Sequence, residues 1–460
     1  MLHLLHAKCA TAVAKYAIRG GLVGVPVTTP CVIGRDALLA ARDEVLDWRF
    51  KSIPASLWGR RIGDITAEAP ADLFADGFLG PLVVLDGPAM EHNLRTLAGW
   101  CADRGVLLAP HGKTTMAPEL FARQIEHGSW GITAANAGQL RVYRAFGVSR
   151  VLLANELLDP AALRWLGTEL DLDPGFEFTC WVDSVAGVAL MTEALGPRDR
   201  PVDVLVELGG AGGRTGVRDV GTAVAVAEAV RDSPALRLAG VAGYEGALAH
   251  DSGPESLATI ASYLDGLRDL TRDIAARGLF GTDQVIVTAG GSAYFDQVTA
   301  ALTADWGELA VLPVLRSGAY LTHDDGFYRG ISPLGEHPRV AGVPPLRSAL
   351  RAWAQVVSKP EPDLALLTMG KRDASFDEGL PTPRLLRRPG AEPVELTGHT
   401  VTALNDQHTF LSLAPGSPVE VGDWIGFGLS HPCTVFDKWT LLPVVAADGH
   451  TVTDLIRTYF

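Results

Sequence analysis

Between residues 80 and 320, short apolar runs alternate with segments in which apolar residues recur every three or four positions. A continuous apolar run of four to eight residues is typical of a buried strand, and three- to four-residue spacing is typical of an amphipathic helix. The pattern therefore predicts strands and helices in alternation. The eight predicted strands are Gly105–Pro110, Gly131–Ala135, Arg150–Asn155, Glu177–Asp183, Val202–Leu208, Leu238–Tyr244, Gln284–Ala289 and Val311–Ser317.

Helical spacing fills the intervals between these runs, in Pro118–His127, Gly138–Phe146, Val220–Arg231 and Pro254–Arg277. Eight strands alternating with helices over roughly 210 to 250 residues have the size and rhythm of a (β/α)8 TIM-type barrel. The active site of such a barrel lies at the carboxyl ends of its strands. An open doubly wound sheet is the alternative fold.

From about residue 340 the sequence pattern changes to short β-like runs separated by breaks rich in proline and glycine. The stretch Ala447-Asp448-Gly449-His450 is typical of a tight turn between two final strands. A smaller, mostly β domain is therefore expected at the C-terminus. Its predicted strands are Ala352–Val357, Leu364–Met369, Phe410–Leu413, Trp424–Gly428 and Trp439–Val445.

These patterns divide the chain into an N-terminal extension over 1–74, a barrel over 75–335 and a C-terminal β domain over 336–460. Within the extension, Ala10–Val27 is mildly apolar but is interrupted by Lys15, Arg19 and several glycines. That run is shorter and more broken than a membrane span, so a surface helix and loop are expected there.

Composition narrows the class of protein. Apolar residues make up 47% and charged residues 20% of the 460 positions, as in ordinary globular enzymes. The 39 basic and 53 acidic residues give a net charge of −14, which disfavours nucleic acid and anionic membranes as partners. The five cysteines are odd in number and widely spread, which indicates a reducing compartment such as the cytoplasm.

Lys113 is the first candidate for chemistry. It lies in Pro110-His111-Gly112-Lys113-Thr114, directly after the first predicted strand. A lysine at the carboxyl end of a buried strand opens onto the mouth of the barrel, where a desolvated amine can form a Schiff base. Most lysines are solvated surface charges, so position alone does not decide the role of Lys113.

Two glycine-rich loops follow later strands. Gly290-Gly291-Ser292 comes after the seventh, and barrels commonly bind phosphate after strands seven and eight, where bare amides and a hydroxyl approach the oxygens. Glu207–Val217 comes after the fifth, and its Arg214 could hold an anionic oxygen in a fixed fork. Each loop could equally be an ordinary turn.

His431 and Cys433 form a third candidate group. They lie two positions apart, so on an extended segment both side chains point to the same face, and imidazole with thiolate suits Zn²⁺. Two ligands leave positions open for water or substrate, as in a catalytic site. His408 and Asp437 are further candidate ligands, and two unrelated core residues are the plainer interpretation.

In this order, the motifs around Lys113, Arg214, Gly290-Gly291-Ser292 and His431-Pro432-Cys433 resemble the D-serine dehydratase and D-threonine aldolase family. That family belongs to the alanine racemase-like (fold-type III) class of pyridoxal phosphate (PLP) enzymes, with an N-terminal barrel and a C-terminal β domain. The resemblance covers most of residues 75–445. Asp47-Trp48-Arg49-Phe50-Lys51 resembles an N-terminal extension of bacterial members described as amino acid deaminases or aldolases.

The resemblance implies a role for each motif residue. Lys113 becomes the Schiff-base lysine, Arg214 a partner of the cofactor ring or its phenolic oxygen, and His111 a cofactor contact. Tyr244, after the sixth strand, becomes a cofactor-binding and catalytic residue. Gly290, Gly291 and Ser292 become part of the phosphate cradle.

His431 and Cys433 match the zinc ligands of the dehydratase branch, whereas the aldolase branch more typically has an acidic residue in place of Cys433. His323 and Asp324, after the eighth strand, and Gln407 and His408 are implied to line the substrate pocket. The resemblance also implies a homodimer with active sites near the interface.

The expected function is a PLP-dependent, zinc-assisted lyase that removes the β-hydroxyl of D-serine-like substrates to give a 2-oxo acid and ammonia. The alternative is an aldolase that cleaves a D-3-hydroxy amino acid to glycine and an aldehyde. A racemase needs a second base, and the only tyrosine after residue 330 is Tyr459, near the terminus. A PLP-binding protein without activity would not need the C-terminal domain.

Overall fold

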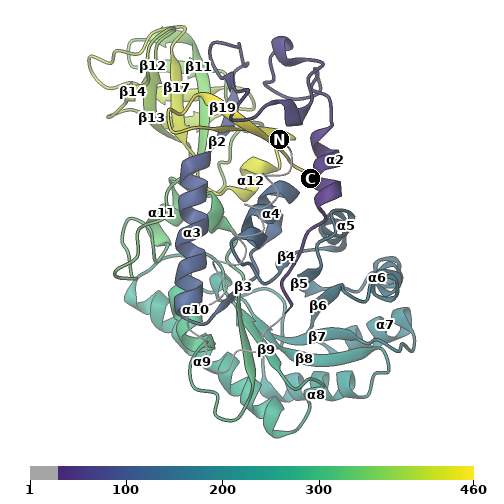
Figure 1. Cartoon of the computed structure of the whole chain (residues 1–460). Coiled ribbons are helices and arrows are strands. Elements are labelled where there is room, and N and C mark those ends of the chain that lie inside the picture. The colour runs from purple at the N-terminus through teal and green to yellow at the C-terminus, as the bar shows by residue number, and fades with distance from the viewer. Residues whose placement is uncertain (1–28) are drawn as a thin grey trace.

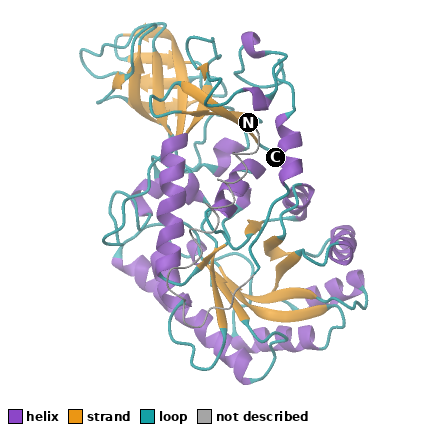
Figure 2. Cartoon of the chain, in the orientation of Figure 1, coloured by secondary structure: helices purple, strands orange, loops and turns teal. Residues whose placement is uncertain are grey.

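The computed structural model of the chain describes residues 29–460, so the surface helix and loop predicted over Ala10–Val27 lie outside the described residues. Two β-sheets organise the described chain (Figure 1). One is a parallel sheet of eight strands, and the other has eleven strands. Figure 2 shows most helices gathered around the parallel sheet, with the second sheet at the opposite end of the molecule.

The parallel sheet confirms all eight predicted barrel strands. Neighbours follow chain order from β4 to β10, and β3 lies beside β10. A parallel bridge between His111 and Thr133 joins the end of the first strand to β4 and completes the ring. A doubly wound sheet would reverse its strand order part-way, so that alternative is wrong. The strands are β3 (Leu107–Leu108), β4 (Ile132–Ala134), β5 (Arg150–Glu156), β6 (Glu177–Val182), β7 (Val202–Leu208), β8 (Leu236–Gly243), β9 (Val285–Ala289) and β10 (Val311–Leu315).

The four predicted helices are confirmed. Polar caps fix several helix starts: the Asp219 carboxylate accepts a hydrogen bond from Thr222 N at 2.8 Å, and α8 begins at the next residue. The predicted helices correspond to α4 (Pro118–Glu126), α5 (Ala137–Ala145), α8 (Val220–Arg231) and α9 (Pro254–Ala276), and the other helices are α2 (Arg35–Arg42), α3 (Gly87–Asp103), α6 (Pro160–Leu172), α7 (Val185–Leu195), α10 (Phe295–Leu302), α11 (Phe327–Ile331) and α12 (Cys433–Phe436).

The second sheet contains the five strands predicted near the C-terminus and the tight turn at Ala447–His450. It also recruits β2, which lies inside the range 75–335 expected for the barrel but pairs with β11 and β18. The sheet is therefore built from segments on both sides of the barrel in the sequence. Its strands are β1 (Ala71–Asp72), β2 (Leu82–Asp86), β11 (Leu350–Glu361), β12 (Leu364–Leu367), β13 (Thr382–Arg387), β14 (Val394–Glu395), β15 (Thr400–Leu404), β16 (Thr409–Ser412), β17 (Trp424–Gly428), β18 (Leu441–Val445) and β19 (Thr451–Arg457).

Buried side chains fill the barrel, so it is a packed core with its opening at the strand ends. Trp130, Trp181, Leu205 and Leu312 form part of a cluster contributed by different strands and loops. A second, much larger cluster runs from the barrel helices into the C-terminal sheet. The two sheets therefore share one continuous apolar core.

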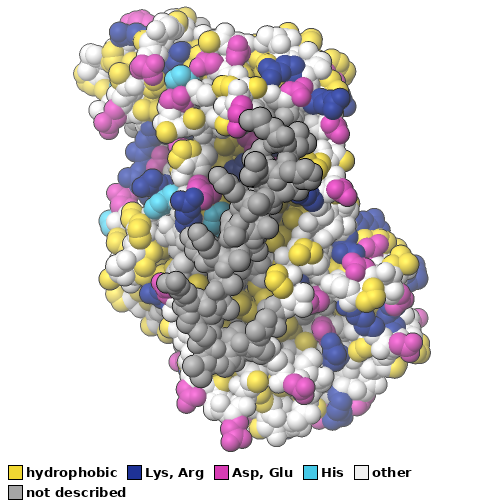
Figure 3. Space-filling view, viewed as in Figure 1, with side chains coloured by type: hydrophobic (Ala, Val, Ile, Leu, Met, Phe, Trp, Pro, Cys, Tyr) yellow, Lys and Arg dark blue, Asp and Glu magenta, His cyan; other side chains and the backbone are white. Residues whose placement is uncertain are grey.

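The surface carries charged side chains of both signs. On the face drawn in Figure 3, Lys and Arg side chains are interspersed with Asp and Glu. Cys31, Cys101, Cys180 and Cys433 are free thiols. Within residues 29–460, every helix is too short or too polar to cross a bilayer.

Candidate active site

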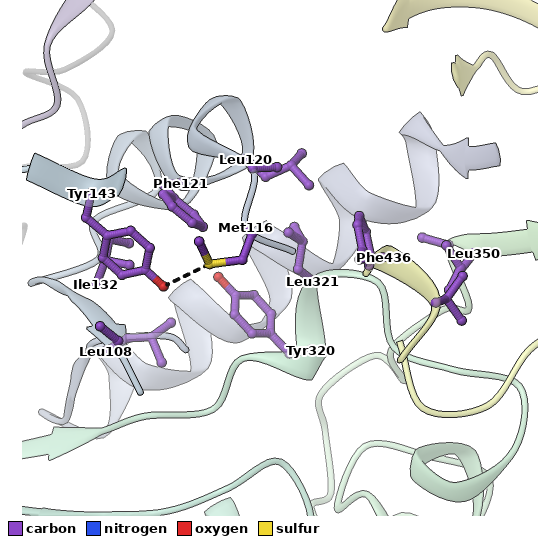
Figure 4. Close-up of a cluster of buried hydrophobic side chains, with 14 of the residues drawn as sticks. Leu108, Met116, Leu120, Phe121, Ile132, Tyr143, Tyr320, Leu321, Leu350 and Phe436 are labelled. Carbon is purple, nitrogen blue, oxygen red and sulfur yellow. Dashed lines mark hydrogen bonds between the residues drawn. The ribbon is translucent and has the colours of Figure 1, made fainter. Parts of the chain in front are cut away.

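The loop after β3 carries Lys113 and packs tightly against buried side chains. Gly112 has no room for a side chain, because a Cβ atom there would lie 2.5 Å from Tyr143 Oη and 2.9 Å from Ile132 Cγ2. Met116 has a φ of 43°, and its sulfur accepts a hydrogen bond from Tyr143 Oη at 3.9 Å (Figure 4). This packing fixes the short turn that carries Lys113 at the barrel mouth.

Lys113 and His111 share a cationic environment. Burial lowers the pKa of Lys113, Cys433 counteracts this, and Arg214 and Arg316 lower the pKa further. Burial, followed by Lys113, Arg316 and Arg214, depresses the pKa of His111 well below its ordinary value. His111 is therefore neutral, and its buried Nδ1 has no hydrogen-bond partner among the described residues.

Tyr244 links the loops after β7, β8 and β9. The Arg214 guanidinium lies 5.0 Å from the centre of the Tyr244 ring, and a Cβ atom on Gly291 would lie 3.1 Å from Tyr244 Cε2. Tyr244 N donates to Tyr263 Oη at 2.9 Å. Burial and the neighbouring Glu245 raise the pKa of Tyr244, so its phenol keeps its proton and can donate it.

Gly290, Gly291 and Ser292 form a tight loop after β9, as predicted. Gly290 has a φ of 106°, which favours glycine. Ser292 Oγ accepts from Ala319 N at 3.2 Å, so its own hydroxyl proton remains available. Gly291 N is already bonded to Glu245 Oε1 at 2.9 Å, so this amide is not bare in the way the sequence suggested.

Two groups at the barrel mouth escaped the sequence analysis. Arg316, directly after β10, donates to Thr288 Oγ1 and to Gly243 O, each at 2.6 Å, while its buried Nε has no partner among the described residues. Glu156, at the end of β5, has its pKa raised to about 8 by burial and by Glu207 and Asp183. Each is a charged residue at the carboxyl end of a predicted strand, and that position was the available signal.

His431 and Cys433 lie next to each other, but not on the extended segment that was expected. His431 has a φ of 50°, Pro432 is helical, and Cys433 begins α12, so the same-face argument from an extended backbone is wrong. A left-handed turn followed by a helix brings the two side chains together instead. A hydrogen bond with Cys433, then interaction with Asp377, raises the pKa of His431 to about 9 although burial opposes the shift.

Cys433 connects the C-terminal part of the chain to the Lys113 loop. Its Sγ donates to Thr114 Oγ1 at 3.4 Å, across 319 positions of sequence. Burial would raise the pKa of Cys433, but hydrogen bonds with His431 and Thr114 outweigh it and lower the pKa. The candidate metal pair and the candidate cofactor lysine therefore occupy one site.

Asp324 holds the backbone around this site through hydrogen bonds. Its Oδ2 accepts from His431 N at 3.1 Å, and its Oδ1 accepts from Tyr328 N at 2.8 Å at the start of α11. Asp324 thus holds the backbone of His431 and α11, a positioning role that differs from the expected substrate contact. Tyr328, which the sequence analysis did not single out, has its pKa raised well above the ordinary value by burial, then by Tyr244 and Cys433.

The remaining predicted residues lie elsewhere. His323 lines a separate cavity of about 620 Å³ with Arg329 and Glu336, and this cavity does not reach Lys113. Gln407 and His408 are exposed in the turn between β15 and β16. Asp437 pairs with Lys438 at 3.2 Å. Residues 29–460 contain no cluster of three or more potential metal ligands, so His431 and Cys433 stand as a two-residue set.

Residues 349–445, which include His431 and Cys433, match the family of the serine dehydratase domain. A D-threonine aldolase from an Arthrobacter species is 27% identical over 372 residues, which cover 80% of this chain and 89% of that protein. The chain is thus similar to the D-serine dehydratase and D-threonine aldolase family in both its C-terminal domain and most of its length.

Solved structures show the fold of this family. D-threonine aldolase from Filomicrobium marinum superposes with a TM-score of 0.70 and 24% identity, covering 83% of this chain and 95% of that one. D-threo-3-hydroxyaspartate dehydratase from a Delftia species gives a TM-score of 0.66 and 21% identity, covering 83% and 97%. The alanine racemase-like architecture expected from the motifs is thereby confirmed.

Proposed function

We propose that this protein is a PLP-dependent, zinc-assisted lyase that eliminates the β-hydroxyl of D-serine or a similar D-3-hydroxy amino acid. The observation that carries the proposal is the approach of Cys433 to the Lys113 loop, with Sγ 3.4 Å from Thr114 Oγ1. It places a thiol and imidazole pair beside the amine that would hold the cofactor.

The residues present fit PLP. Lys113 is a largely buried amine with a lowered pKa, His111 Nδ1 and Arg316 Nε are buried without partners among the described residues, and Ser292 has a free hydroxyl proton. A ring with polar substituents would satisfy such groups. Lys113 would hold it, Arg214 and Tyr244 would flank it, and the Gly290–Ser292 loop would receive its phosphate.

The residues also fit a catalytic metal. Asp377 Oδ2 lies 2.5 Å from His431 Nδ1, which leaves Nε2 as the free ligand atom of the imidazole, and the His431 side chain also interacts with that of Cys433. A borderline metal such as Zn²⁺ accepts this pair and keeps positions open for water and substrate. A structural zinc would need four protein ligands, and the described residues supply two.

Bound PLP would supply an electron sink for the Cα carbanion, and bound zinc Lewis-acid assistance to departure of the β-hydroxyl. Side chains of the protein supply proton transfer and orientation. The released amine of Lys113, whose lowered pKa favours its neutral form, accepts the Cα proton. Tyr244 keeps its phenol protonated beside Arg214, and the two side chains would orient the cofactor. Loss of water from D-serine gives 2-aminoacrylate, which hydrolyses to pyruvate and ammonia.

The test incubates the purified protein with D-serine, D-threonine and D-3-hydroxyaspartate, with and without Zn²⁺. The expected result is a 2-oxo acid and ammonia from D-serine, with turnover that depends on the metal. Production of glycine and an aldehyde without any 2-oxo acid would replace elimination by aldol cleavage.

Aldol cleavage is the second candidate, because the relative that matches 80% of this chain is named a D-threonine aldolase. The same Lys113, His431 and Cys433 would serve it, with the substrate hydroxyl losing its proton and the Cα–Cβ bond breaking. Elimination is preferred because Cys433 stands where the aldolase branch more typically has an acidic residue. Racemisation has less support, because the only tyrosine after residue 330, Tyr459, packs its ring on Phe146.

A further inference from the structure

One segment of the C-terminal domain, Gly370–Glu378, packs against the loop that carries His431. Asp377 bonds His431 Nδ1 through one carboxylate oxygen and accepts from Thr434 Oγ1 at 2.8 Å through the other. Ser375 Oγ donates to Ser430 O, and Ser430 Oγ donates to Glu378 O at 2.8 Å. The orientation of the imidazole therefore depends on where this segment, hereafter the 370–378 segment, is held.

The other side of the 370–378 segment is held by the N-terminal extension. Lys51 Nζ lies 2.6 Å from Asp373 Oδ1 and donates to Arg372 O at 3.0 Å. The same ammonium lies 4.2 Å from the centre of the Trp439 ring, and Trp439 Nε1 donates to Asp373 O at 2.8 Å. Lys51 thus contacts both the 370–378 segment and the chain that follows α12.

The two side chains of the Lys51–Asp373 ion pair differ in their exposure to solvent. The Asp373 side chain is 1% exposed, whereas that of Lys51 is 38% exposed. A buried carboxylate that loses its cation is costly, because the remaining charge is left uncompensated. Asp373 and its segment would then have to move or rearrange, while Lys51 itself would simply meet water.

We infer that Lys51 is a positioning residue for His431, so that the N-terminal extension is part of the metal-binding machinery through the 370–378 segment. This inference rests on the proposed role of His431 as a metal ligand. It gives a function to the Asp47–Lys51 motif, which the barrel and the C-terminal domain leave unexplained. Residues that orient metal ligands from outside typically change metal affinity by about 10- to 100-fold.

The test compares four full-length proteins: wild type, Lys51→Met, Lys51→Arg and Lys371→Met. Lys371 is the matched control, because it lies on the same segment and loses the same charge, but its ammonium faces the Phe376 ring at 5.4 Å and contacts no part of the extension. Affinity is measured by titration with Co²⁺, whose thiolate absorption reports Cys433 directly, and with Zn²⁺ by competition. Amide hydrogen exchange of the metal-free proteins is followed over 370–378 and 430–436.

Lys51→Met is expected to weaken metal binding by about 10-fold and to speed exchange in both segments. Lys51→Arg is expected to restore most of both, and Lys371→Met to resemble wild type. If Lys51→Met matches wild type in affinity and in exchange, or if Lys371→Met changes both as much, the inference is wrong. If wild type binds no metal, the zinc proposal fails, and the exchange of 430–436 alone decides whether Lys51 positions His431.

Discussion

At the scale of single residues, the site combines groups whose ordinary protonation is altered by burial. Burial lowers the pKa of Lys113 and of His111, and the neighbouring arginines lower both further. Burial and Glu245 raise the pKa of Tyr244, although the same arginines oppose that rise. Displaced pKa values of this kind are typical of catalytic sites.

Lys113→Ala is expected to abolish the visible absorption of the bound cofactor and the covalent adduct formed on borohydride reduction, since no amine remains to form the Schiff base. The measurements are an absorption spectrum and peptide mapping of the reduced protein. Lys359→Ala, on β11, should retain both. A reduced adduct on another lysine would disprove the assignment of Lys113.

Cys433→Ala is expected to lower D-serine turnover by about 100-fold or more, because the variant loses a ligand of the catalytic metal. The thermal midpoint should barely change, because this metal does not hold the fold together. The assay uses D-serine and β-chloro-D-alanine side by side. Chloride leaves without metal assistance, so the chloro compound should retain most of its turnover. Equal loss of both substrates would show that the metal does not assist departure of the hydroxyl.

At the scale of elements, the site depends on short loops at the strand ends. Gly112 allows the Lys113 turn to pack on Tyr143, and Gly291 allows the loop after β9 to pass the Tyr244 ring. The absence of a side chain at each position lets two strand ends approach closely.

Gly291→Leu is expected to weaken PLP binding about 10- to 100-fold, because a Cβ atom there would lie 3.1 Å from Tyr244 Cε2 and overpacking costs about 1–3 kcal/mol. Cofactor retention is measured by dialysis and fluorescence. Gly99→Leu, on α3 where a Cβ atom would meet nothing within 4 Å, is the control. Unchanged retention in Gly291→Leu would move the phosphate seat elsewhere.

At the scale of the whole molecule, the barrel carries buried acidic groups at a cost in stability. Both carboxylate oxygens of Glu156 are buried without a partner among the described residues, and its pKa is raised to about 8 by burial, Glu207 and Asp183. The folded protein therefore holds a proton that the unfolded chain releases near its ordinary pKa of 4.5. The stability linked to this proton is fully present below about pH 4.5 and is lost as the pH rises through about 8.

Glu156→Gln is expected to gain stability relative to wild type as the pH rises from 5 to 8. The gain is about 1–2 kcal/mol in the cofactor-free protein, less than the full shift would give, because solvent screens the partly exposed side chain. Denaturant unfolding at each pH measures the difference. The exposed Glu255→Gln should show no such trend. A wild-type minus variant difference that is constant across this range would mean that Glu156 is ionised in the folded state.

The sequence by itself determined the barrel, because apolar spacing is a local property that reports which face of each element is buried. It also singled out Lys113, the Gly290–Ser292 loop and the His431-Cys433 pair as candidates, because their residue types limit the chemistry open to them. Tertiary structure alone decided which of these meet: Thr114 contacts Cys433 across 319 positions, whereas Gln407 and His408 stay in an exposed turn. The addition of β2 to the C-terminal sheet and the contact of Lys51 with Asp373 were equally invisible, because pairing between distant segments leaves no mark on either segment alone.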